Sequence, residues 1–237
     1  MAEVTGLRLD RSVALKEKRL RALLGDRSLS DPGLRDTVAD AQLLGSLELS
    51  GFGLSWAQVR ARDQPLVAEV GALRAAQKAV DPAAPFSVAA LRTWHLAAVS
   101  GGGRFRDRDL SPLAVDVAPP APVPFIEGRL AILEEWMTGE SARELKPAQA
   151  GALVLARLVE ILPFAAGNGR VSRLAASHVM VGGGLRPPIL VGGDRLRLEA
   201  CLRAAFRLDT EPLATLLQEA SERCLDVMIQ SLEAAHT

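Results

Sequence analysis

The 237-residue chain contains no tyrosine, three histidines and two cysteines. Its cysteines, Cys201 and Cys224, have neither the spacing of a metal-binding motif nor that of a disulfide framework. We therefore expect buried thiols in a reducing compartment. Lysine is scarce too: four of the 28 basic residues are lysines, which leaves 24 arginines, a usage typical of GC-rich bacterial coding.

Long apolar runs are also missing. No stretch approaches the roughly 20 uninterrupted apolar residues that a membrane span needs, and the N-terminus carries acidic residues where a signal peptide has an apolar run. The 28 acidic residues balance the 28 basic ones, so the overall charge favours neither nucleic acid nor an anionic membrane surface. We expect a cytoplasmic protein that binds neither.

Apolar residues recur at three- and four-residue spacing between Gly and Pro clusters, which predicts an all-α protein. The 49% hydrophobic content is ample for a core. One segment breaks the pattern: residues 104–124 hold five of the 14 prolines and a short alternating run at 113–117, which predicts a loop with a small strand pair. The predicted helices span about residues 12–24, 34–49, 66–80, 87–99, 125–137, 147–161, 169–181, 194–208 and 212–234.

The stretch "ILPFAAGNGRVSR" at 161–173 joins the end of one predicted helix to the start of the next. Free N–H groups in the first turn of the second helix, its positive dipole end and the two glycines Gly167 and Gly169 together favour a bound phosphate or carboxylate. Arg170 and Arg173, three residues apart, lie on one face of that helix and can contact the same anion. A Gly-Asn-Gly-Arg turn at a helix start is, on its own, more often a structural turn than a ligand site.

The longer pattern, Pro163-Phe164-x-x-Gly167-Asn168-Gly169-Arg170-x-x-Arg173, resembles the active-site motif of the Fic family, which reads His-Pro-Phe-x-(Asp/Glu)-Gly-Asn-Gly-Arg-x-x-Arg. The sequence "GRFRDRDL" at 103–110 and the Pro-rich segment after it also follow the order of elements in Fic proteins. The resemblance covers about residues 35–225. It implies one Fic-like helical domain over 1–237, with a small β-hairpin flap near 113–123.

Fic proteins most often transfer AMP from ATP to a protein hydroxyl. By resemblance, the motif histidine is the general base, the acidic residue holds Mg²⁺, and Gly167, Asn168, Gly169, Arg170 and Arg173 bind phosphate. Here Leu162 stands at the histidine position and Ala166 at the acidic position. An aliphatic side chain cannot accept a proton, and losing a positioned base typically costs about 10²–10⁴ in rate. Because the carboxylate is missing, we expect the chain itself to supply no metal site. Mg²⁺ could still arrive bound to ATP.

No other residue is an obvious replacement for the base. His95 and His178 lie in apolar helical contexts and are interpreted as structural, and His236 is next to the chain end. Asp and Glu are absent from residues 161–193.

A second Fic feature is also altered. Many Fic proteins carry an inhibitory helix, Ser/Thr-x-x-x-Glu-Gly/Asn, whose glutamate pairs with the second motif arginine. "SLELSG" at 46–51 matches with Ser50 in the glutamate position, within a possible vestigial inhibitory helix at 34–50. Glu48 is two residues away and points to another face. The alternative is an ordinary helix end.

Three functions are consistent with these residues. The first is a catalytically inactive Fic-fold protein that binds a nucleotide, a phosphate or a phosphorylated metabolite, or that regulates a protein partner or forms a homodimer. The second is a transferase of AMP or another phosphate-containing group with a rearranged site. The third is a purely structural or interaction module.

Overall fold

The computed structural model describes residues 2–25, 28–29, 31–60, 68–110 and 119–235, with the backbone alone for 2–8 and 10. Over these residues the fold is all-α, as predicted, and contains no strand. The elements are α1 (Ala2–Leu24), α2 (Pro32–Leu49), α3 (Trp56–Arg60), α4 (Ala68–Lys78), α5 (Val88–Ala98), η2 (Val123–Phe125), α6 (Ile126–Thr138), α7 (Glu140–Arg143), α8 (Pro147–Ile161), α9 (Asn168–Gly182), η3 (Gly192–Asp194), α10 (Arg195–Ala205) and α11 (Glu211–Ala234).

Each predicted helix is present, with differences at the ends. Helix α1 begins at Ala2 instead of Ser12, and α10 ends at Ala205 instead of Leu208. The short helices α3 and α7 were not predicted, because four or five residues are too few for a helical period to show. The predicted strand pair is not seen: residues 119–122 form no strand, and 111–118 lie outside the described residues, so the hairpin stays a prediction.

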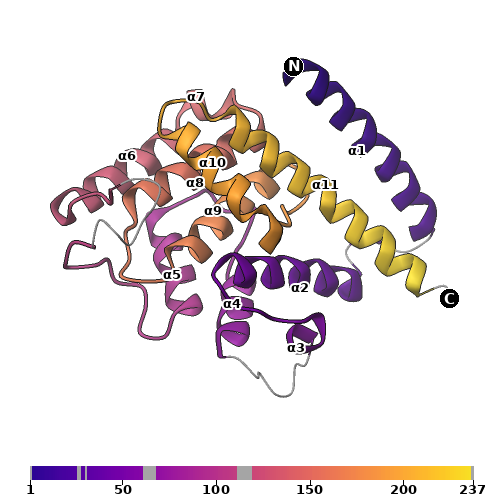
Figure 1. The fold of residues 1–237 in the computed structure, drawn as a ribbon, viewed down its shortest axis with the longest axis horizontal. Helices are drawn as coiled ribbons and strands as arrows, with labels where there is room; N and C mark the ends of the chain where they lie inside the picture. The colour runs from indigo at the N-terminus through magenta and orange to yellow at the C-terminus, as the bar shows by residue number, and fades with distance from the viewer. Residues whose placement is uncertain (1, 26–27, 30, 61–67, 111–118, 236–237) are drawn as a thin grey trace.

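Helices α8 and α9 form a contacting pair at the centre of the molecule and are joined by the short connection 162–167 (Figure 1). One apolar cluster packs α8 and α9 against α2, α4, α5 and α6, and a second packs them against α10 and α11. Helix α1 lies along α11 at the edge of the molecule (Figure 1). The connection between α8 and α9 is therefore anchored at both ends by buried helices. That residues 1–237 form one domain, with a core of about 35–225, stays a prediction.

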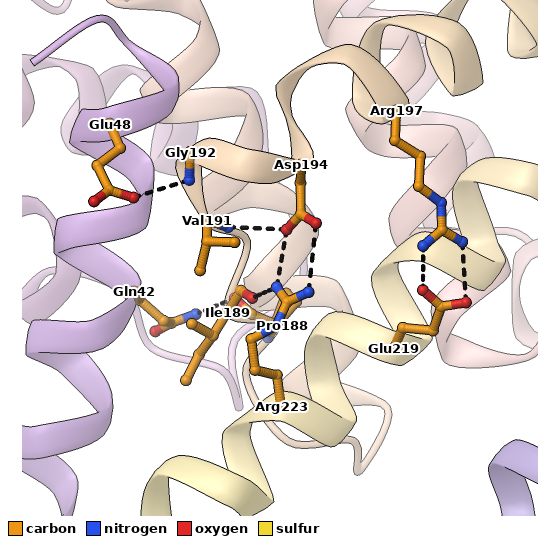
Figure 2. Close-up of polar contacts among 10 residues, drawn as sticks. All are labelled: Gln42, Glu48, Pro188, Ile189, Val191, Gly192, Asp194, Arg197, Glu219 and Arg223. Carbon is orange, nitrogen blue, oxygen red and sulfur yellow. Dashed lines mark hydrogen bonds and ion pairs between the residues drawn. The ribbon is translucent and has the colours of Figure 1, made fainter.

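The C-terminal half of α2 is held against the segment before α10. Gly45 lies so close to this segment that a Cβ on it would be 1.7 Å from the carbonyl oxygen of Leu190. Gln42 Nε2 donates to the carbonyl oxygen of Pro188 at 3.1 Å, and the Gly192 N–H donates to Glu48 Oε2 at 2.9 Å (Figure 2). These contacts hold the C-terminal half of α2 against residues 188–192. Within the described ranges, no helix combines the length and apolar character that crossing a bilayer takes.

Candidate phosphate-binding site

The side chain of Asn168 closes the turn that precedes α9. The Phe164 N–H donates to Asn168 Oδ1 at 2.9 Å, and Asn168 Nδ2 donates to the Phe164 carbonyl oxygen at 2.7 Å. Gly167, with φ of 74°, is in the left-handed region that favours glycine. The Asn168 side chain therefore shapes the turn, and its backbone N–H is left to meet a ligand.

The first turn of α9 has no side-chain cap. Within the described parts of the chain, the backbone N–H groups of Asn168, Gly169 and Arg170 have no hydrogen-bond partner; the first bond of the helix runs from the Val171 N–H to the Gly167 carbonyl oxygen at 3.2 Å. These N–H groups lie at the positive end of a 15-residue helix. Their geometry is that of an anion-binding helix N-terminus.

Arg170 and Arg173 flank this turn. Arg170 Nη2 is 3.6 Å from the place that a Cβ on Gly167 would take, and Arg173 Nη1 is 3.1 Å from the corresponding place on Gly169. Burial, followed by the positive charges of Arg170 and Arg195, lowers the pKa of Arg173 to about 9. Burial also lowers the pKa of Arg170. Both side chains remain cationic at neutral pH, in an environment that opposes their charge.

The other side of Arg173 contacts α2. Its Nε donates to Ser46 Oγ at 3.0 Å, and its Nη2 donates to the Ser46 carbonyl oxygen at 2.7 Å and to Ser50 Oγ at 2.9 Å. Ser50, which the resemblance places at the position of the inhibitory glutamate, thus contacts Arg173. Glu48 points elsewhere, as expected, because its carboxylate accepts the Gly192 N–H. A small cavity of about 30 Å³ adjoins Ser46 and Arg173 between α2 and α9.

Leu162 ends α8 in the left-handed conformation, with φ of 46° and ψ of 64°, which is unfavourable for a residue with a Cβ. Its side chain is buried. Arg106 holds the backbone there: its Nε donates to the Leu162 carbonyl oxygen at 2.8 Å, and its N–H donates to that of Pro163 at 2.9 Å. The guanidinium of Arg106 is itself buried and also donates to the carbonyl oxygen of Ala121.

The sequence did not reveal this role of Arg106. A buried arginine bound to backbone carbonyls leaves no periodic signal, and its position in "GRFRDRDL" served only as part of a resemblance. It caps the carbonyl end of α8, where a positive charge complements the helix dipole.

His95 contacts the same turn from α5. It accepts the Gly103 N–H at Nδ1, 2.8 Å away, so Nε2 carries the proton and donates to the Ala166 carbonyl oxygen at 2.9 Å. Its ring stacks on Phe164 at a centroid distance of 3.6 Å. Burial, and to a lesser extent Arg170, lowers its pKa. Both ring nitrogens are engaged, so His95 supports the turn and leaves no lone pair for a base; its contact with the turn was missed because 71 residues separate it from Ala166.

The remaining candidates for proton transfer or metal binding lie elsewhere. His178 is buried on α9 against Trp94, and burial lowers its pKa. His236 is outside the described residues. The side chain of Ala166 is exposed, and no group of three or more His, Cys, Asp or Glu side chains that could hold a metal occurs in the described ranges. Glu69, on α4, is the carboxylate whose charge acts on Arg170, and it raises the pKa of that arginine.

Comparison with known proteins finds relatives of the segment that carries this site. The model of the Fic/DOC family matches residues 85–180, which include α5, α8, the turn and most of α9. "Protein adenylyltransferase Fic" of Drosophila virilis is 32% identical over 132 residues, covering 54% of this chain and 26% of that protein. The protein of the same name from Drosophila mojavensis is 33% identical over 115 residues, covering 47% of this chain and 22% of its own. The chain thus spans about a quarter of the length of these curated relatives.

Solved structures share the fold. A Fic domain containing signaling protein from Bacteroides thetaiotaomicron superposes with a TM-score of 0.79 at 18% identity, over 94% of this chain and 98% of that one. Fic-1 from C. elegans superposes with a TM-score of 0.77 at 19% identity, over 98% of this chain and 75% of that one. The family model over residues 85–180 and the sequence relatives support a Fic/DOC domain in this chain, and the solved structures share its fold.

Proposed function

We propose that this chain is a Fic protein that binds a phosphate-bearing ligand and lacks the transferase chemistry of its relatives. The observation that carries the proposal is a contrast within one turn between the groups that bind an anion, which are present, and the base, which is missing. Uncapped N–H groups and two arginines surround Gly167 and Gly169, while a buried leucine, Leu162, occupies the position of the base. The anion-binding half of the motif depends on backbone and arginine, both of which are present.

The enzyme alternative draws on the curated relatives, which are named protein adenylyltransferases. Such an activity here would need a base from outside the turn. His95 contacts the turn, and both of its ring nitrogens are hydrogen-bonded. This geometry favours binding over catalysis.

The structural alternative has an observation of its own. Arg173 uses Nε and Nη2 to bind the end of α2, which is what a purely structural arginine would do. A purely structural role, however, does not explain why the N–H groups of Asn168 and Gly169 and the Nη1 of Arg173 have no hydrogen-bond acceptor among the described residues.

Titration with inorganic phosphate and with AMP, followed by NMR, tests the proposal. We expect modest, salt-sensitive binding, because salt screens the interaction between the arginines and an anionic ligand. Arg170→Ala and Arg173→Ala should each weaken it, whereas Arg129→Ala, on the exposed face of α6, should not. If neither compound binds, or if both site variants bind as wild type does, the structural alternative is correct.

A protein partner also remains part of the proposal. A solved Fic structure with a TM-score of 0.53 to this chain is that of IbpAFic2 covalently tethered to Cdc42, so the fold can present its site to another protein. For this chain the partner would be a protein target or a second copy. The two free cysteines are buried, which fits a cytoplasmic location.

A further inference from the structure

Two adjoining hollows lie along the outer face of α8. The first, of about 510 Å³, lies between α6 and α8, and the second, of about 480 Å³, lies between α8 and the end of α10. Leu153 and Arg157 of α8 line both, so the hollows form one groove with α8 as its floor. The wall on α6 carries Ile132 and Trp136, and the wall at the end of α10 carries Leu208. This surface is called the α8 groove below.

Leu208 is unfavourable for the folded chain in two ways. It follows α10 in the left-handed conformation, with φ of 68°, where the Asp209 N–H donates to the Ala204 carbonyl oxygen at 3.1 Å. Such a position usually holds glycine or asparagine, because a Cβ is strained there. The leucine side chain is also 91% exposed. A strained residue whose apolar side chain gains nothing from its own fold indicates a contact with another molecule.

The opposite wall of the groove offers an apolar surface that could bury such a side chain. Ile132 is 66% exposed, and Trp136, one turn further along α6, is half-buried beside it. Single exposed apolar residues are ordinary, but here a protruding leucine and an apolar hollow lie on the two walls of one groove. The chain therefore supplies both halves of an apolar contact that it does not make with itself.

The charges of the groove distinguish its floor from the wall at Leu208. Arg129 and Arg157 pair with the same carboxylate, that of Glu160, and no other charged residue lines the two hollows. The floor therefore keeps one excess positive charge. Asp209, next to Leu208, is exposed and forms no ion pair with a described residue.

The neighbouring charges match in the same way. Arg207 precedes Leu208, and Glu135 precedes Trp136 on α6; both are exposed, and neither has an ion pair within the described ranges. Each charge beside the protruding leucine thus has an opposite charge in the rest of the groove. Such a surface complements a second copy of itself, because a two-fold axis along the groove brings each wall against the opposite wall of the partner.

We propose that the α8 groove is a self-association surface on which two copies of the chain form a two-fold dimer. Leu208 of each copy fills the hollow beside Ile132 and Trp136 of the other, and Asp209 of each lies beside the other copy's Arg157. Each copy supplies one protruding leucine and one hollow, so the contact closes at two copies. The inference goes beyond the phosphate-binding function and does not rest on it, because the groove shares no residue with the turn.

Analytical ultracentrifugation over a range of protein concentrations tests the inference on wild type, Leu208→Asn, Ile132→Asn and Leu196→Asn. Leu196 is the matched control, because it is 77% exposed on α10 and lines neither hollow. Wild type should dimerise. Leu208→Asn and Ile132→Asn should each weaken the dimer at least about ten-fold, since each removes two buried apolar side chains from the dimer, whereas Leu196→Asn should not weaken it. Asparagine tolerates the left-handed conformation, so Leu208→Asn should not lower the thermal unfolding temperature.

Charge reversal tests how the two copies are oriented. Asp209→Arg and Arg157→Glu should each weaken the dimer, because each brings like charges together. The double variant should dimerise more tightly than either single variant, because the pair is restored with its signs exchanged. A double variant weaker than both single variants would overturn the proposed arrangement.

A wild-type chain that stays monomeric up to its solubility limit overturns the inference and leaves the groove to a different protein. A dimer as tight in Leu208→Asn as in wild type overturns it too, because the contact would then use another surface. Titration of wild type and Leu208→Asn with inorganic phosphate separates this inference from the proposed function. A monomer that binds phosphate removes the dimer alone, whereas a dimer that binds no phosphate removes the proposed function alone.

Discussion

The Nη2 atom of Arg173 lies 2.9 Å from the hydroxyl oxygen of Ser50, across the contact between α9 and α2. Ser50 is exposed at the C-terminal cap of α2, and its hydroxyl also donates to the carbonyl oxygen of Ser46 at 2.9 Å. A neutral hydroxyl at this position leaves the charge of the arginine available. By resemblance to inhibited Fic proteins, a carboxylate here would oppose the binding of an anionic ligand.

Ser50→Glu should place that carboxylate beside Arg173 and weaken phosphate binding. An exposed ion pair contributes about 0–1 kcal/mol, and 1 kcal/mol is roughly a five-fold loss of affinity. Calorimetric titration measures the effect, and Ser141→Glu, on the exposed surface of α7, controls for added charge.

A double-mutant cycle identifies the cause. If the glutamate acts through Arg173, Ser50→Glu should have no further effect in an Arg173→Ala background. Equal binding by wild type and Ser50→Glu would show that residues 46–51 are an ordinary helix end.

Gly45→Ala and Gly71→Ala should have opposite effects on stability. A methyl group on Gly45 would lie 1.7 Å from the Leu190 carbonyl oxygen, so α2 must shift, at a cost of about 1–3 kcal/mol or more. A methyl group on Gly71, exposed in α4, meets nothing within 4 Å and should stabilise that helix by about 0.5–1 kcal/mol. Urea denaturation measures both.

The shift of α2 should also reach the site, because Ser46 follows Gly45 and binds Arg173. Gly45→Ala should therefore change the Arg173 side-chain signals in NMR spectra, whereas Gly71→Ala should not. A Gly45→Ala protein as stable as wild type would contradict the packing described for α2.

The helices could be predicted from the sequence, because buried faces impose a three- and four-residue spacing that survives without tertiary information. The turn could be predicted as well, because Gly167, Asn168 and Gly169 have local conformational meanings. The residues that support the turn could not be predicted. His95 and Arg106 reach it from segments far away in sequence, and each acts by hydrogen bonding to backbone carbonyls, which leave no trace in the sequence of the turn itself.

The stability of the protein should fall as the pH falls below about 6.5, the ordinary pKa of histidine. Burial lowers the pKa of His95 and of His178 in the folded state, so the unfolded chain binds protons more readily. Their stabilisation is present above the unfolded pKa and is lost below it, by up to about 1.4 kcal/mol per pH unit for each histidine.

Denaturation of wild type and His95→Leu from about pH 5 to about pH 8, which spans the ordinary pKa of histidine, measures this dependence. His95→Leu should also destabilise at pH 8 by about 1–3 kcal/mol, because the Gly103 N–H and the Ala166 carbonyl oxygen lose their partner. Thr93→Ala, exposed on α5, is the control and should change little. A pH dependence in His95→Leu as steep as in wild type would show that His95 titrates normally.

Wild type should transfer no AMP, and restoring two side chains should produce slow transfer. With ATP and Mg²⁺ or Mn²⁺, we expect no labelling of the protein itself or of lysate proteins above a heat-denatured control. Labelling of wild type that is lost in Arg170→Ala would contradict the proposed loss of chemistry. The expectation follows from Leu162, whose aliphatic side chain cannot take a proton, and from Ala166, which cannot hold a metal.

The reconstruction is Leu162→His with Ala166→Asp. The structure favours it, because Arg106 already fixes the backbone at residue 162, and because His95 binds the carbonyl oxygen of Ala166 and leaves the exposed side chain of that residue free to change. A positioned base is worth about 10²–10⁴ in rate, so the double variant should label itself detectably, whereas Leu162→Ala with Ala166→Asp, which lacks the base, should not. Equal labelling by these two variants would show that residue 162 is not where the proton is taken.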